Sequence, residues 1–164
     1  MNSLRLITAF AIGSAALSSA IPATAQAATP ASIGILPGTW NCTTHGSTGT
    51  SAGTVTFTPV LPTLVQYQYA NTSGKNAGHK GSGIWFYDSK KGEYVAMGAG
   101  QDGWGVSRGS ASVDATTITL IDTYPSDPAN GKTTYHFAAS TISFTSDWKK
   151  DGKPMHIAQT CTKA

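Results

Sequence analysis

Apolar and polar residues alternate with a period of two along most of the chain after residue 27. Runs of this kind are typical of strands that are buried on one face, whereas a helix repeats every three to four residues. No part of this region keeps helical spacing for more than a turn or two, so we expect an all-β domain. The pattern predicts about ten short strands: Thr39 to Thr43, Gly53 to Thr58, Thr63 to Ala70, Gly83 to Asp88, Tyr94 to Ala99, Trp104 to Ala111, Thr116 to Tyr124, Thr133 to Ala139, Thr141 to Trp148 and Met155 to Thr162.

Turn-forming residues separate consecutive runs. Residues 88–92 (DSKKG), 101–103 (QDG), 125–131 (PSDPANG) and 150–154 (KDGKP) combine Gly, Pro, Asn and Asp, which supply the backbone geometry of tight hairpins. The Gly- and Lys-rich segment 74–83 lacks the order of a phosphate-binding loop and is expected to form a hairpin loop at one end of the fold. Consecutive hairpins predict an up-and-down antiparallel meander.

Residues 1–27 differ from the rest of the chain. Arg5 precedes an apolar run from Leu6 to Ala20, and small residues form two overlapping cleavage patterns that end at Ala25 and Ala27. This arrangement is typical of a secretory signal peptide, although a retained membrane anchor is an alternative that the short, interrupted apolar run disfavours. We expect a signal peptide over 1–27, a lead-in segment over 28–37 and a single domain over 38–164. The mature protein would then be exported to the periplasm or the extracellular space, with no membrane segment.

The two cysteines lie in the first and last predicted strands, at Cys42 and Cys161. Export favours a disulfide, and a disulfide requires Cα atoms within about 7 Å. The pair therefore predicts that the meander closes into a barrel, with its first and last strands tied together. Trp40 has the same strand parity as Cys42, so we expect its ring to close one end of the interior.

The charge balance narrows the class of partner. The chain has 11 Lys and Arg against 8 Asp and Glu, a net charge of +3, and removal of the leader takes away Arg5. This excess is too small to indicate nucleic acid or an anionic membrane as a partner. A small-molecule ligand is the expectation that remains.

Two motifs resemble a known superfamily. Gly38-Thr39-Trp40, at the start of the first strand, resembles the Gly-x-Trp signature of lipocalins and other calycins. Residues 83–104 (GIWFYDSKKGEYVAMGAGQDGW), followed by 116–124 (TTITLIDTY) and a late Asp-Gly-Lys turn, are similar to bacterial lipocalin-like domains of unknown function of the DUF1579 type. The resemblance implies a calycin-like barrel and supplies no catalytic residue.

The opening Leu36-Pro37-Gly38-Thr39-Trp40 also resembles nitrobindin-type haem barrels, which place an iron-binding histidine on the last strand. That resemblance implies haem at His156, and His136 could join it there or at a transition metal. His156 has the opposite parity from Cys161, so a regular strand turns it outward and only a bulge would bring it inside. Partly exposed histidines without a ligand are the alternative.

Aromatic residues on the strands suggest a cavity. Barrels of about eight to ten strands enclose packed side chains or one small ligand. We expect a small apolar or amphipathic ligand, bound without catalysis; the alternative is that the rings only fill the core. The candidate ligand-binding residues are Tyr67, Tyr69, Trp85, Met97, Trp104 and Tyr124.

Other function classes have less support in the sequence. Most aspartates lie at predicted turns or near the ends of predicted strands, where they serve backbone geometry. A protein-recognition scaffold is a third hypothesis, because small secreted bacterial metalloprotease inhibitors also resemble the chain at Gly-x-Trp. An exposed apolar stripe over Ala31 to Pro37 would favour it, whereas burial of Ile33, Ile35 and Leu36 would count against it.

Overall fold

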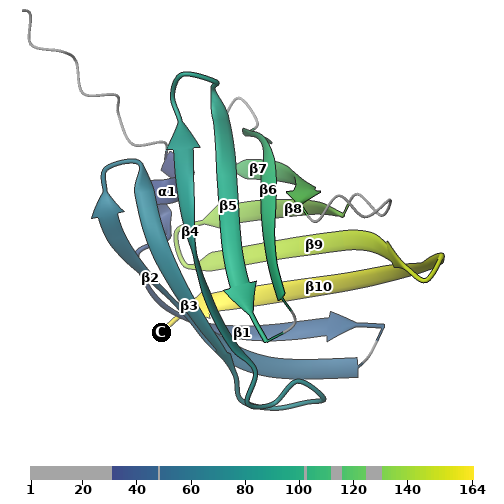
Figure 1. Ribbon diagram of the computed structural model, residues 1–164. Helices are drawn as coiled ribbons and strands as arrows, with labels where there is room; N and C mark the ends of the chain where they lie inside the picture. The colour runs from purple at the N-terminus through teal and green to yellow at the C-terminus, as the bar shows by residue number, and fades with distance from the viewer. Residues whose placement is uncertain (1–30, 48, 102, 112–115, 125–130) are drawn as a thin grey trace, which may run out of the picture.

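The computed structural model describes residues 31–47, 49–101, 103–111, 116–124 and 131–164, and these form one short helix and a closed antiparallel barrel (Figure 1). The predicted signal peptide, the start of the lead-in segment and most of the 125–131 turn lie outside these residues. The elements are α1 Ala31–Ile35, β1 Gly38–Gly46, β2 Gly49–Leu61, β3 Leu64–Asn71, β4 Lys80–Asp88, β5 Glu93–Gly100, β6 Gly103–Ala111, β7 Thr117–Tyr124, β8 Lys132–Ala138, β9 Thr141–Lys150 and β10 Lys153–Lys163.

Every strand pairs with its neighbour in sequence, and β1 also pairs with β10. The predicted all-β meander and its closure are therefore confirmed. Several strands are longer than the alternation indicated, β2 most of all, because its ladder to β1 continues through the Gly- and Thr-rich residues 49–53. Neighbouring residues in this segment differ little in hydrophobicity, so the sequence shows no alternation that would predict a strand.

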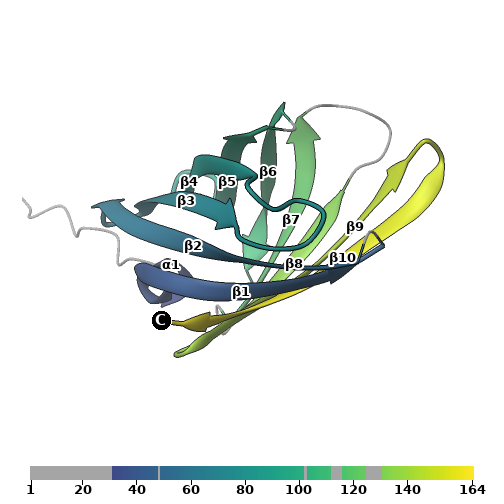
Figure 2. The same cartoon turned by 90° about the horizontal axis from the view of Figure 1, so that it is seen from below.

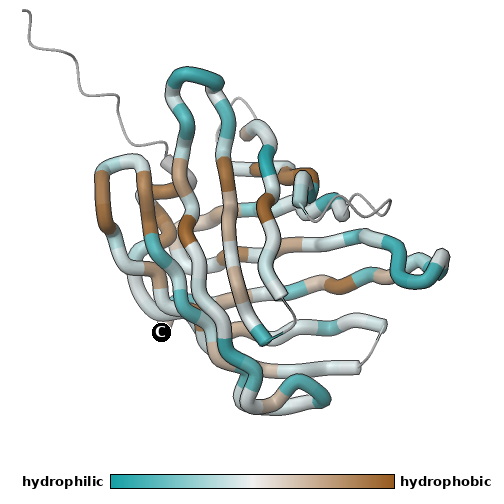
Figure 3. Tube along the Cα trace, viewed as in Figure 1, coloured by the Kyte–Doolittle hydropathy of each residue, from teal (hydrophilic) through white to brown (hydrophobic). Residues whose placement is uncertain are grey.

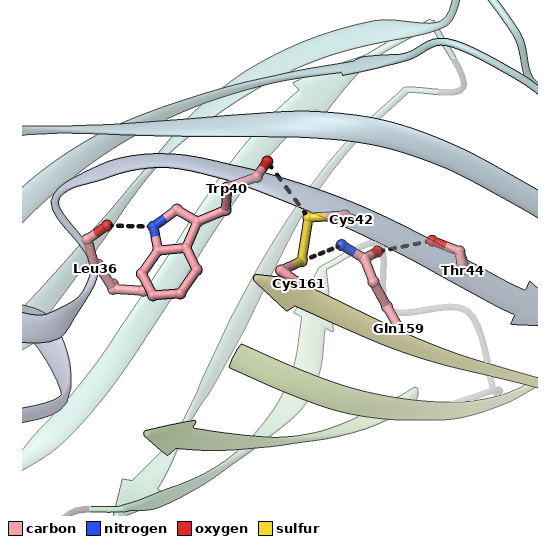
Figure 4. The surroundings of a disulfide bond; sticks show 6 residues. All are labelled: Leu36, Trp40, Cys42, Thr44, Gln159 and Cys161. Carbon is pink, nitrogen blue, oxygen red and sulfur yellow. Dashed lines mark hydrogen bonds between the residues drawn. A yellow bond between two sulfur atoms is a disulfide. The ribbon is translucent and has the colours of Figure 1, made fainter. Parts of the chain in front are cut away.

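The seam of the barrel is covalent. Cys42 and Cys161 face each other in the β1–β10 ladder and form a disulfide with a Cα–Cα distance of 4.0 Å (Figure 4). The predicted disulfide is thus confirmed. Its register also determines which residues face inward, because alternate residues of each strand share a face.

The helix α1 covers one end of the barrel. Ile33 and Leu36 are 2% and 1% exposed, and Trp40 is completely buried beside them. The Trp40 indole Nε1 donates a hydrogen bond of 2.8 Å to the Leu36 carbonyl oxygen (Figure 4). Sequence reasoning treated this segment only as a lead-in and missed the helix. Its burial counts against the protein-recognition hypothesis, which needed an exposed stripe here.

The opposite end is formed by the β1–β2, β3–β4, β5–β6 and β9–β10 connections, since β1 begins beside α1 and runs away from it (Figures 1 and 2). Hydrophilic residues gather at the β3–β4 and β9–β10 connections (Figure 3). Within the described part of the chain, no helix is long and apolar enough to cross a membrane. The β4–β5 connection at the α1 end is hydrophilic as well (Figure 3), so the two ends differ chiefly because α1 packs its apolar residues over one of them.

Candidate functional site

The barrel encloses a cavity of about 1120 Å³. Its lining reaches from the disulfide and Trp85 in the interior to Ser47, Lys75 and Lys150 on the connections far from α1. The cavity is thus open at the end far from α1, which we call the mouth, and is closed at the α1 end. Such an arrangement admits a molecule from one direction only.

Aromatic rings from five strands form the deep part of the cavity. Tyr135 packs edge to face on Trp85, with ring centroids 4.7 Å apart, and lies 5.1 Å from Phe144. Phe57 and Tyr67 add a second pair at 6.1 Å. Offset and edge-to-face pairs of this kind stabilise one another beyond their buried area. The result is a rigid apolar surface that can contact a ligand.

Tyr67 and Tyr69 lean from β3 across β4 and β5. A Cβ at Gly83 or Gly98 would overlap the Tyr67 ring or hydroxyl, and a Cβ at Gly81 or Gly100 would overlap Tyr69. The four glycines are paired across the β4–β5 ladder, Gly81 with Gly100 and Gly83 with Gly98. Glycine at these positions permits the close approach of the rings.

Burial keeps the cavity phenols protonated. Desolvation, and then the neighbouring Tyr69, raise the pKa of Tyr67 to about 12. The pKa of Tyr135 is also raised, chiefly by burial and then by Tyr67 and Asp122. Both hydroxyls therefore stay protonated to higher pH than a free tyrosine, and each can donate or accept a hydrogen bond inside an apolar cavity.

One polar side chain is held against the disulfide. The Thr44 hydroxyl donates to Gln159 Oε1 at 3.0 Å, and Gln159 Nε2 lies 3.0 Å from Cys161 Sγ (Figure 4). Both Thr44 and Gln159 line the cavity. Ser107, which also lines it, donates to Asp122 Oδ1 at 2.5 Å. These fixed polar groups in an otherwise apolar wall are typical of a small-molecule pocket.

Three of the predicted ligand-binding residues, Tyr67, Tyr69 and Trp85, line the deep cavity, and Trp104 lies at the mouth with 54% of its surface exposed. The remaining two do not line it. Met97 is 38% exposed, because it lies between the inward-facing Ala96 and Gly98 and so points outward.

Tyr124 also departs from the expectation that it lines the cavity. It shares the parity of the buried Ile118 and Leu120, but the β6–β7 register shifts where Val106 pairs with Tyr124 and Ser107 with Asp122. The extra residue on β7 turns the ring outward. Tyr124 is 44% exposed and stacks on Trp104, with centroids 3.9 Å apart.

The two histidines proposed for haem or a metal lie on the outer surface. His156 Nδ1 is 2.7 Å from Asp147 Oδ1, and His136 Nδ1 is 3.0 Å from the Thr117 hydroxyl. The β9–β10 register is continuous through His156, so the bulge that would turn it inward is missing. Neither side chain points into the cavity. In the described ranges, no group of three His, Cys, Asp or Glu side chains could hold a metal ion.

Sequence reasoning did not select several residues that line the cavity: Phe57, Lys75, Tyr135, Phe144, Lys150 and Gln159. For the strand residues, their parity relative to the disulfide could have predicted that they face inward. Cys161 pairs with Ile142, and Ile142 pairs with Phe137, so parity counted outward from the disulfide assigns the inward face strand by strand. The loop residue Lys75 has no such signal.

No family model and no curated protein match the chain. Among solved structures, the crystal structure of Rv2717c from M. tuberculosis is similar, with a TM-score of 0.65 and 17% identity over 82% of this chain and 96% of that chain. The chain also matches the redesigned β-barrel b11L5F_LGL, with a TM-score of 0.47 and 19% identity over 81% of this chain and 95% of that chain. A further match is EF1p2_mFAP2b bound to DFHBI, with a TM-score of 0.41 and 19% identity over 81% of this chain and 97% of that chain. The similarity to Rv2717c supports the barrel fold and no specific function.

Proposed function

We propose that this protein binds one small apolar or amphipathic molecule inside its barrel and holds it without chemical change. The observation that carries this proposal is the cavity of about 1120 Å³, floored by aromatic rings and open at one end. Ligand pockets are usually about 300 to 1,000 Å³ and mostly apolar. Desolvation of apolar surface would drive binding, at about 25 cal/mol per Å² before ordering costs.

The polar groups of the cavity are suited to binding a ligand and not to catalysing its conversion. The cavity lining contains no Asp or Glu among the described residues, so it offers no carboxylate pair for hydrolysis. The Ser107 hydroxyl donates to Asp122 instead of to a histidine that could activate it. Gln159 and Tyr67 are suited to orienting a bound molecule.

We also propose that the protein acts outside the cytoplasm, in the periplasm or the extracellular space. The Cys42–Cys161 disulfide supports this location, because such bonds persist in oxidising compartments. The leader-like residues 1–27 would direct the export. Mass spectrometry of the protein recovered from a periplasmic fraction, with its N-terminal residue determined, tests both export and cleavage after Ala27.

A neutral fluorescent probe, N-phenylnaphthylamine, tests the binding proposal directly. We expect its emission to rise in the presence of the protein and to fall again when an apolar competitor is added. Ala96→Trp places a large ring in the cavity and should weaken probe binding severalfold. The matched control Met97→Trp changes the next residue, which faces outward, and should bind the probe like the wild type.

Circular dichroism of both variants establishes that each is folded. If the folded wild type does not bind the probe, or if Ala96→Trp binds it as tightly as Met97→Trp does, the interior is not the binding site. Native mass spectrometry of the purified protein complements the probe, since a copurified ligand appears as extra mass that is lost on denaturation.

A further inference from the structure

We infer that the ligand is a long-chain amphipathic anion whose apolar chain lies along the inner face of β9 and β10 and whose negative head lies at the mouth near Lys150 and Lys75. This inference rests on the proposed function and specifies the chemical class of the molecule that the cavity takes. Three features of the site support it: its lining is positively charged, its lysines form no ion pair with described residues, and its wall is an extended apolar surface.

The charged residues that line the cavity are of one sign. Lys75 and Lys150 line it at the mouth together with His79, whereas none of the described lining residues is Asp or Glu. Lys75 lies on the β3–β4 connection and Lys150 at the end of β9, so the two cations belong to different connections around the opening. Both cations line the cavity near its opening, so each attracts the negative head of an entering ligand.

The mouth lysines differ in their partners from two basic residues at the α1 end, Lys91 and Arg108. There, Arg108 Nη1 is 2.6 Å from Glu93 Oε1, and Lys91 Nζ is 3.9 Å from the same oxygen. Lys75 and Lys150 form no ion pair with any residue that the structure describes, and both side chains are exposed. Their ammonium groups are therefore able to bind an external anion without first breaking an internal pair.

The β9–β10 hairpin continues the apolar wall out to the charged mouth. Among the described residues, the β8–β9 ladder ends at Asp147 and the β1–β10 ladder at Ile157, and Ser47 bonds to His156 just beyond. On the inner face of the hairpin tip, Trp148 pairs with Met155, and both line the cavity. Together with Phe144 and Ile157, this pair gives the hairpin a largely apolar inner face that leads to Lys150.

The length of this inner face sets the size of the ligand. Phe144, in the aromatic floor, and Lys150, at the mouth, are both on β9. Six strand residues at about 3.3 Å each place them roughly 20 Å apart. A molecule that contacts the floor with its tail and Lys150 with its head must therefore have a long chain.

Displacement of N-phenylnaphthylamine by three compounds with the same chain tests the inference: tetradecanoate, tetradecanol and tetradecyltrimethylammonium. We expect the carboxylate to bind at least about fivefold more tightly than the alcohol, and the cation to bind more weakly than both. The difference between carboxylate and alcohol should shrink as salt is raised, because the mouth is exposed to solvent.

Two pairs of variants locate the head group. Lys150→Met and Lys75→Met should each weaken tetradecanoate about fivefold and leave tetradecanol unchanged. The controls Lys149→Met and Lys80→Met remove the same charge from exposed strand residues that do not line the cavity, and they should leave both compounds unchanged. The controls Lys149→Met and Lys80→Met should also bind the neutral probe as the wild type does.

Equal affinity for the carboxylate and the alcohol would overturn the inference while leaving the proposed function intact, since the probe still reports a bound ligand. Equal weakening by Lys149→Met and Lys150→Met would also overturn it, because it would indicate diffuse surface charge instead of a head-group site. A fourth competitor, lysophosphatidylglycerol, distinguishes the source of the anion: binding comparable to tetradecanoate points to membrane lipids, and much weaker binding points to free fatty carboxylates.

Discussion

Tyr67 lies directly over Gly98, two strands away: the tyrosine hydroxyl on β3 occupies the space into which a side chain at Gly98 on β5 would project. Gly83, on the intervening strand β4, lies under the same ring. The ring can reach this far only because neither position carries a side chain. The shape of the cavity wall therefore depends on glycines that no local turn requires.

A double-mutant cycle tests this contact. Gly98→Ala should lower the free energy of unfolding by about 1 to 3 kcal/mol, because its methyl group overlaps the Tyr67 hydroxyl. Tyr67→Phe removes that oxygen, so the double variant should recover much of the loss, with a coupling of about 1 kcal/mol or more. Urea denaturation of the four proteins measures the cycle.

Gly83→Ala provides the contrast, because its added Cβ meets the Met97 carbonyl oxygen as well as Tyr67. Backbone does not move aside when the hydroxyl is removed, so Tyr67→Phe should rescue Gly83→Ala poorly. Similar rescue at both glycines would show that the described packing of Tyr67 is wrong.

The disulfide should make a large contribution to stability. Its cysteines are 119 residues apart in sequence, and closing a loop of this length stabilises by about 4 to 5 kcal/mol in the chain-entropy model. Replacing both cysteines by serine should lower the urea midpoint accordingly, and a reductant should lower the wild-type melting temperature but not that of the double variant. A melting temperature that does not respond to reductant would contradict this prediction.

Stability should fall at alkaline pH. The pKa of Tyr67 is raised from 10.0 to about 12 by burial in the folded state, so above pH 10 the unfolded chain loses this proton while the folded protein keeps it. The unfolded state then binds fewer protons, and the free energy of unfolding decreases as pH rises, by about 2 kcal/mol as pH approaches 12. Tyr135, with a pKa raised in the same direction, adds to the decrease.

Denaturant unfolding at a series of pH values measures this slope. Tyr67→Phe should make the slope shallower, whereas Tyr124→Phe, at an outward-facing ring that is 44% exposed, should leave it as in the wild type. An identical slope in all three proteins would show that Tyr67 does not titrate differently in the folded and unfolded states.

The helix α1 and the residue that follows it should stabilise the barrel through two buried side chains, Ile33 and Leu36. Leu36→Ala and Ile33→Ala should each lower the free energy of unfolding by about 2 to 5 kcal/mol, because these side chains are 1% and 2% exposed. Gly34→Ala is the matched control: its added Cβ meets no atom within 4 Å, and it should be neutral or stabilising. Loss of α1 packing would also expose Trp40 and shift its fluorescence to longer wavelength.

Much of the fold could be predicted because it depends on local or covalent information. Period-two alternation and turn residues indicated the strands, and Cys42 and Cys161 in the first and last strands indicated closure, since a disulfide tolerates only a short Cα separation. The helix α1 was missed because its five residues, Ala31–Ile35, are too few to show a helical repeat of apolar positions. The leader and the export of the protein remain predictions from sequence.

The candidate site depended more on the tertiary structure. Strand periodicity divides residues into two faces but does not say which face is inside, and one extra residue on β7 reverses the assignment for Tyr124. Sequence therefore determined that this chain forms a barrel closed by a disulfide, with many aromatic residues on its strands. Only the packing decided that Tyr67 crosses to Gly98 and that Lys75 and Lys150 line the same cavity, because these relationships join residues far apart in the chain.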